Sequence, residues 1–217
     1  MKIYSDEIRG IRARLVAALA GAFALMVFDA AAARAATMHF KVDVDRSTVS
    51  ASVAEPAAFI RGNAVGTFRI IDGAVSVDPA NISGTGKVRM LIDATSYRSD
   101  NVSRDRSVTE KSLEADKYPT IGFESNSVVG TVITNPHEGT GIVTGFLTLH
   151  GEAHAMTMTV HATLGADGVF AGDGEVTFNY EDFGVKVPAV LFHTILAGDE
   201  VTVHFHIIAV NAAAPPQ

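Results

Sequence analysis

Apolar and polar residues alternate strictly over several long segments of the chain. From Met156 to Leu164, apolar side chains occupy every second position, with threonine or histidine between them. The same alternation runs through Val201–Ile207, Val176–Tyr180 and Val49–Val53. A period of two is the repeat of a β-strand, whose successive side chains point to opposite faces. Each segment therefore has one apolar and one polar face, which is typical of antiparallel sheets.

Turn-forming clusters separate the alternating segments. Clusters that contain glycine together with aspartate, asparagine or proline mark breaks in extended structure. Such clusters lie at residues 71–73, 81–84, 135–139, 165–168 and 197–199. Their spacing predicts about eight strands, a number typical of a closed barrel or a sandwich.

One stretch departs from this alternation. Residues 105–115 are mostly polar and contain neither glycine nor proline, and Val108 and Leu113 are their only large apolar residues. The stretch ends shortly before Tyr118-Pro119, where proline disfavours helical structure in the residue before it. We therefore predict an all-β fold with one short surface helix near residues 105–115. No second domain or internal repeat is apparent.

The first 36 residues have the pattern of a secretory signal peptide. Basic residues precede an uncharged apolar run, Leu15–Phe28, and Ala33-Arg34-Ala35 offers small residues for cleavage. Asp29 ends the apolar run before it reaches the roughly 20 residues that a membrane-spanning helix needs. We therefore expect export to the periplasm and no membrane anchor in the mature form.

Cleavage leaves one domain, residues 37–211, and a short tail, 212–217, that we expect to be disordered. Removing five basic and three acidic residues with the signal changes the formal net charge from −7 to −9. That charge repels phosphate backbones, so nucleic acid is not an expected partner. The chain has no cysteine, so its stability must come from a hydrophobic core rather than from disulfides.

Several short blocks of residues follow one another in a distinctive order. They are Ile92–Ser96, Arg104-Asp105, Lys117-Tyr118-Pro119-Thr120-Ile121, Thr144–Gly151, Asp182-Phe183-Gly184-Val185 and Gly198-Asp199-Glu200-Val201. A single block such as Asp-Phe-Gly is weak evidence, and it is not a kinase motif here. The ordered set resembles the YceI-like family (polyisoprenoid-binding domain) from about Phe40 to Val210.

The resemblance implies an eight-stranded, lipocalin-like antiparallel barrel with a short helix. It also implies a periplasmic protein that carries or sequesters an isoprenoid lipid, including quinone-type tails, with a role in stress response or quinone handling. Some members of the family form dimers, so a homodimer is an alternative oligomeric state for this chain. Members often carry a His-Ser pair before the first long strand and a further histidine within it. Here Asp45-Arg46-Ser47 and Val53–Ala57 stand at those places, and Pro56 favours a strand break.

On this fold, the apolar rows of the strands form the wall of the interior. An eight-stranded barrel is just wide enough to be filled by its own side chains or to hold one slim ligand. The ligand-binding candidates are Val88, Met90, Ile92, Phe123, Leu147, Leu149, Met156, Met158, Val160, Phe178 and Phe205, and Ile121 is a further inward candidate. Alternation does not distinguish an apolar pocket from a filled core. A filled barrel that acts through its surface is therefore the alternative function.

Arg104 is the candidate for a polar contact at the mouth of the barrel, because arginine pairs with phosphate or with a quinone oxygen. The adjacent Arg104 and Asp105 also suit a structural role, in which they cap the helix and tie it to the barrel. We favour the structural role.

The histidines suggest metal chemistry only weakly. His150, Glu152 and His154 would share one face of a straight strand, which suits iron or zinc, but Gly151 indicates a hairpin turn between them. His204 and His206 are expected on the outer face of the barrel. No nucleophile elbow, phosphate loop or dinucleotide fingerprint is present, and we predict neither catalysis nor a cofactor.

Overall fold

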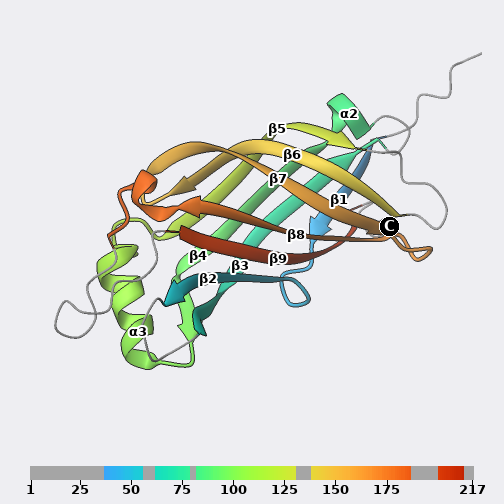
Figure 1. Ribbon diagram of the computed structural model, residues 1–217. Coiled ribbons are helices and arrows are strands. Elements are labelled where there is room, and N and C mark those ends of the chain that lie inside the picture. Colours follow the sequence, from blue (N-terminus) through green and yellow to red (C-terminus); the bar gives the residue numbers. More distant parts are fainter. Residues whose placement is uncertain (1–36, 56–61, 79–81, 131–137, 187–199, 213–217) are drawn as a thin grey trace, which may run out of the picture. The chain divides into compact units, whose positions relative to one another are not determined.

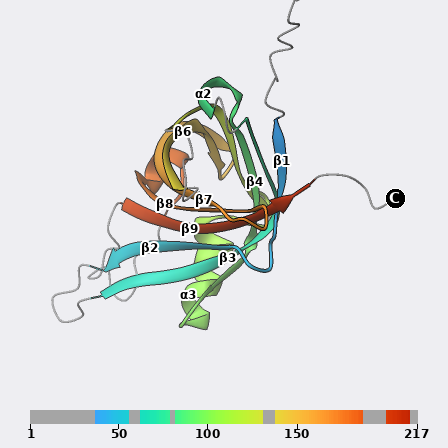
Figure 2. The same cartoon turned by 90° about the vertical axis from the view of Figure 1, so that its right-hand side faces the viewer.

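The computed structural model describes residues 37–55, 62–78, 82–130, 138–186 and 200–212. These residues form one antiparallel sheet of nine strands that curve around a common interior (Figures 1 and 2). The strands are β1 Met38–Val42, β2 Thr48–Glu55, β3 Gly62–Val77, β4 Lys87–Ser99, β5 Thr120–Gly130, β6 Glu138–Leu149, β7 Glu152–Leu164, β8 Val169–Asn179 and β9 Glu200–Asn211.

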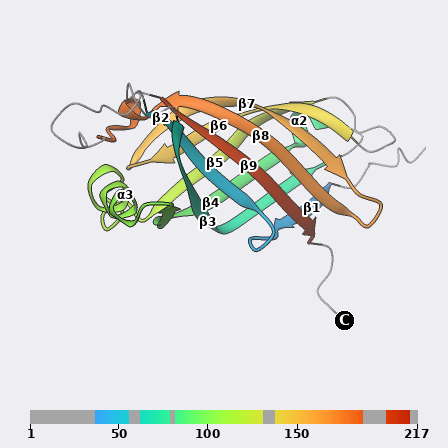
Figure 3. The same ribbon diagram turned by 60° about the horizontal axis from the view of Figure 1, so that its bottom comes forward.

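The sheet closes because β1 and β2 both lie between β3 and β9. Phe40 of β1 faces Val75 near the end of β3, and β2 continues along the same strand, with Val49 facing Phe68. Both strands also pair with β9, and Figure 3 shows β2 and β9 side by side. The nine strands therefore occupy eight positions, which confirms the predicted eight-stranded antiparallel barrel.

A tight turn, residues 43–47, joins β1 to β2. The carboxylate of Asp43 accepts hydrogen bonds from the backbone N–H groups of Asp45 and Arg46, and it pairs with the Arg46 guanidinium at 2.7 Å. The buried Ser47 hydroxyl donates to the carbonyl of Ile208 and accepts from its N–H. The residues that replace the His-Ser pair of the family thus form a turn that is anchored to β9.

Residues 71–73, which we predicted to form a turn, lie inside the long strand β3. The register of β3 with β4 shifts between Ile70 and Asp72, which is a β-bulge. A Cβ at Gly73 would lie 2.7 Å from both Met90 and Val42. The turn prediction was wrong because the Asp-Gly pair instead allows β1 to approach β3 closely.

The other predicted turns fall between strands where they are described. Residues 165–168 join β7 to β8, and the single turn α2, Ile82–Thr85, lies between β3 and β4. The clusters at 135–139 and 197–199 lie partly or wholly outside the described residues. The predicted signal segment, Pro56 and most of the tail also lie outside them.

The predicted surface helix is present with shifted bounds. It comprises α3, Val102–Ser107, and a π-helical turn, η1, Val108–Ser112. It begins early because the Asn101 side chain accepts hydrogen bonds from the N–H groups at the start of α3 and so caps it. α2 and α3 lie at opposite ends of the barrel (Figures 1 and 3). No helix in the described part of the chain has the length and apolarity to cross a membrane.

Candidate functional site

The interior of the barrel holds an apolar cavity of about 320 Å³. This volume is at the lower end of the range of small-molecule sites, roughly 300 to 1,000 Å³. Every apolar residue that the sequence analysis assigned to ligand binding lines it. These residues are Val88, Met90, Ile92, Phe123, Leu147, Leu149, Met156, Met158, Val160, Phe178 and Phe205, together with Ile121.

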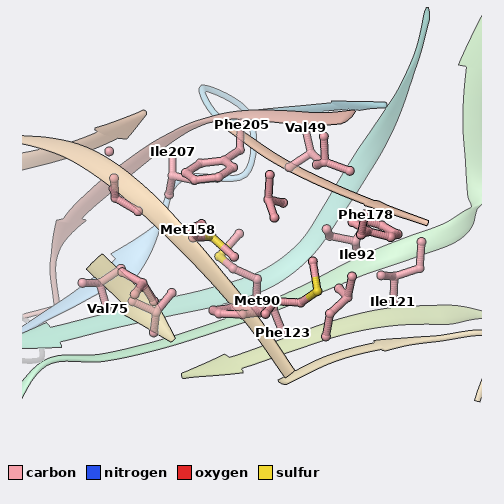
Figure 4. A pocket seen from close by; sticks show the side chains of 18 of the residues that line it. Val49, Val75, Met90, Ile92, Ile121, Phe123, Met158, Phe178, Phe205 and Ile207 are labelled. Atoms are coloured by element: carbon pink, nitrogen blue, oxygen red, sulfur yellow. The ribbon is translucent and has the colours of Figure 1, made fainter. Parts of the chain in front are cut away.

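Strands from different parts of the sequence contribute to this wall. In Figure 4, Met90 of β4, Phe123 of β5, Met158 of β7, and Phe205 and Ile207 of β9 point toward one shared space. They converge because side chains at every second position of a strand face the same side of the sheet. The alternation in the sequence therefore predicted which residues face the interior.

The inward row of β7 is only half-buried. Met156, Met158 and Val160 all line the cavity, yet none of these side chains is as fully buried as a core residue. Protein interiors are normally close-packed, so half-exposed inward side chains mark space that the chain itself does not fill. The two methionines are also flexible, which suits contact with an irregular apolar chain.

The end of the barrel near α3 is filled instead. Phe183, from the single turn η2 (Tyr180–Phe183), and Ala115 are each 1% exposed. The Phe183 ring packs against Phe178 and His154, with ring centroids 5.2 and 4.6 Å apart. Residues outside the strands thus close this end of the interior, and the cavity of the open middle extends only as far as side chains such as Ser112 and Tyr180.

Few polar side chains reach the cavity. Tyr97, Ser112 and Tyr180 line it and are buried. Burial raises the pKa of the Tyr97 phenol, so this side chain stays uncharged. Lys87 is the one charged residue among the described residues that line the cavity. A wall of this kind favours an apolar ligand, because a buried charge or polar group without a partner is costly.

Arg104 does not line the cavity. Its guanidinium pairs with Asp100 at 2.7 Å. The adjacent Asp105 is buried and accepts hydrogen bonds from the N–H and the hydroxyl of Ser99, at 2.7 and 2.6 Å. Asp105 therefore ties α3 to the end of β4, as the structural interpretation expected, but Asn101 rather than Arg104 or Asp105 caps the helix. A contact between Arg104 and a ligand stays a prediction.

A hairpin turn interrupts the His-x-Glu-x-His run. His150 and Gly151 have φ values of 53° and 82° and join β6 to β7. The His150 ring packs on Tyr118, with centroids 4.4 Å apart, whereas His154 packs on Phe183. The described residues contain no group of three or more histidine, aspartate or glutamate side chains placed to hold a metal ion.

His204 and His206 lie on the outer face of the barrel, as predicted. His204 Nδ1 is 3.2 Å from the Glu175 carboxylate, and His206 pairs with Asp173. Both pairs join β9 to β8 at solvent-exposed positions. These histidines therefore belong to the polar outer rows of the sheet.

A sequence model of the YceI-like domain matches residues 40–209. The chain belongs to the YceI-like family. This YceI-like chain is 32% identical over 138 residues to a UPF0312 protein of Pseudomonas savastanoi pv. phaseolicola, which covers 60% of the chain and 68% of that relative. It is 30% identical over 128 residues to a UPF0312 protein of Vibrio cholerae, which covers 56% of the chain and 65% of that relative.

Solved structures share the YceI-like barrel. BcnA of Burkholderia cenocepacia is 26% identical, with a TM-score of 0.64 over 78% of this chain and 99% of BcnA. A polyisoprenoid binding domain from Saccharophagus degradans is 11% identical, with a TM-score of 0.62 over 80% of this chain and 99% of that domain. At that identity, the second similarity shows the fold alone.

The cavity of this YceI-like chain also has lining residues that the sequence analysis did not assign to it. They include Phe68, Val75, Ile82, Val108, Leu113, Val128, Val143, Phe170, Val185 and Ile207. The sequence analysis noted Val108 and Leu113 as the two large apolar residues of the helix. Two residues that are five positions apart do not lie on the same face of an α-helix. They face the interior together because η1 is π-helical, with the Leu113 N–H bonded to the Val108 carbonyl at 2.8 Å.

Proposed function

We propose that this protein binds a long apolar lipid of isoprenoid type, including quinone-type tails, inside the barrel and carries or sequesters it in the periplasm. The observation that supports this function is the unfilled apolar cavity. Burying a hydrocarbon tail there gains about 25 cal/mol per Å² of apolar surface. Such a gain holds a long tail without a charged anchor.

The alternative is a barrel filled by its own side chains that acts through its surface. The half-buried inward residues of β7 favour the carrier, because these side chains have room beside them. The solved neighbour from Saccharophagus degradans is described as a polyisoprenoid binding domain. The proposal extends that description to the interior of the same barrel in the present chain.

Extraction of the native protein tests the proposal. The protein is purified from its own host without detergent, extracted with organic solvent and analysed by mass spectrometry. We expect one isoprenoid lipid in near-equal amount to the protein, and none from Met158→Arg purified in parallel. A wild-type protein free of lipid, which also fails to take up an added prenyl lipid, would contradict the carrier function.

Export is part of the same proposal. The basic start, the apolar run and the small residues Ala33 and Ala35 support it. N-terminal sequencing of the protein from a periplasmic fraction should give a start just after Ala35 or Ala36. A mature protein that retains Leu15–Phe28 would contradict it.

A further inference from the structure

Ser112 places a hydroxyl at the cavity wall that has no hydrogen-bond partner within the described structure. The residue is 4% exposed and is the last of η1. A serine in a helix often bonds the carbonyl four residues earlier. Here the Ser112 hydroxyl does not bond that carbonyl, which belongs to Val108. Burying a hydroxyl without a partner costs free energy, so its presence beside a cavity points to a ligand.

The cavity wall offers few polar groups to this hydroxyl. A buried water needs two to four polar partners, and the cavity wall is almost wholly apolar. Tyr97 and Tyr180, the other buried polar residues of this wall, each have interactions of their own. Of the described residues, His150 also has a buried polar atom without a hydrogen bond, Nε2, but it does not line the cavity and lies 3.4 Å from Glu114.

We propose that the Ser112 hydroxyl donates a hydrogen bond to the polar head of the bound lipid, and that this head is neutral and carries an oxygen acceptor. The inference rests on the proposed carrier function and deepens it. It directs the head toward α3 and the tail along the cavity toward α2. A phosphate or carboxylate head does not suit this end, because Lys87, the cation of the described wall, follows α2 at the opposite end.

Three lipids with the same C20 isoprenoid tail test the proposal. They are geranylgeraniol, geranylgeranyl phosphate and the parent hydrocarbon, titrated into the full-length mature protein. The wild type should bind the alcohol about fivefold more tightly than the hydrocarbon, which is the effect of one neutral hydrogen bond. Ser112→Ala should lose that preference and keep its affinity for the hydrocarbon. Ser103→Ala, at an exposed position of α3, is the matched control and should keep the preference.

Thermal unfolding of the lipid-free protein gives an independent readout. Ser112→Ala removes a buried hydroxyl without a partner, so it should raise the Tm, whereas loss of a merely structural serine would lower it. The inference is overturned if the preference for the alcohol survives in Ser112→Ala, or if the phosphate binds more tightly than the alcohol. In either case the carrier function stands. If neither the alcohol nor the hydrocarbon binds, the carrier function falls and the inference falls with it.

Discussion

Two regions of the barrel interior use the same alternation of residues but are packed differently. Near α3, Phe183 and Ala115 are almost completely buried, whereas Met158 and Val160 in the middle are half-buried beside a cavity. The difference comes from residues outside the strands, because η2 and the segment after η1 add side chains to the α3 end alone. An eight-stranded barrel is close to the size at which its own side chains fill it. What packs into each end therefore decides whether space is left for a ligand.

The largest effect is expected at the filled end. Phe183→Ala should lower the free energy of unfolding by about 3–5 kcal/mol, because it leaves a cavity among buried neighbours. Urea unfolding measures the change. Phe146→Ala is the control, because Phe146 is 49% exposed on the outer face, and it should cost less than about 1 kcal/mol. Equal losses at the two positions would show that the α3 end is not tightly packed.

The open middle should respond in ligand binding instead. Met158→Arg places a charge in the apolar cavity and should weaken lipid binding at least about 100-fold, roughly 2.7 kcal/mol. Titration with a fluorescent prenyl lipid measures the loss. Thr159→Arg is the matched control, because the next side chain along β7 is exposed on the outer face opposite Glu175. Equal loss in both variants would mean that the lipid does not enter the barrel.

A second variant, without a charge, is needed because an inward arginine can unfold the protein. Val160→Phe adds apolar volume to the same wall without adding a charge. If the cavity holds the lipid, this variant should fold and still bind more weakly than the wild type. Unchanged binding in a folded Val160→Phe protein would place the lipid elsewhere.

The sequence predicted which side chains of each strand face the interior better than it predicted how much interior volume those side chains leave open. Alternation identifies Met156, Met158 and Phe205 as inward residues because the strand period is independent of the rest of the fold. Gly73 was misread because a bulge and a turn use the same residue types. The open volume was not predictable, since it depends on how far η1 and η2 reach into the barrel. The π-helical register that turns Leu113 inward has no signal in residue type that we recognised.

Acid should affect the filled end through the buried carboxylate of Asp93. Although burial raises the pKa of Asp93, hydrogen bonds from Thr95 and the pair with Arg69 hold this pKa below its usual 3.8. A lowered pKa stabilises the fold above about pH 3.8, the value in the unfolded chain, and this contribution is lost as the pH falls through the folded-state pKa.

Asp93→Asn should therefore cost about 1–2 kcal/mol near neutral pH and remove part of the acid sensitivity of unfolding. Urea unfolding between pH 2 and 7 measures both. Glu152→Gln, at an exposed position, should change neither. An Asp93→Asn protein as acid-sensitive as the wild type would show that the carboxylate does not stabilise this region.

The smallest effect is expected at a side chain of β7 that is only half-buried. Met156→Ala should cost only about 1 kcal/mol, because its half-buried side chain leaves little new cavity behind. Met90→Ala makes the same chemical change at a position that is 8% exposed and should cost more, about 2–5 kcal/mol. Both residues line the cavity, so the pair compares packing alone. Equal costs would mean that β7 is as tightly packed as β4, and that the half-exposed inward row of β7 does not mark unfilled space.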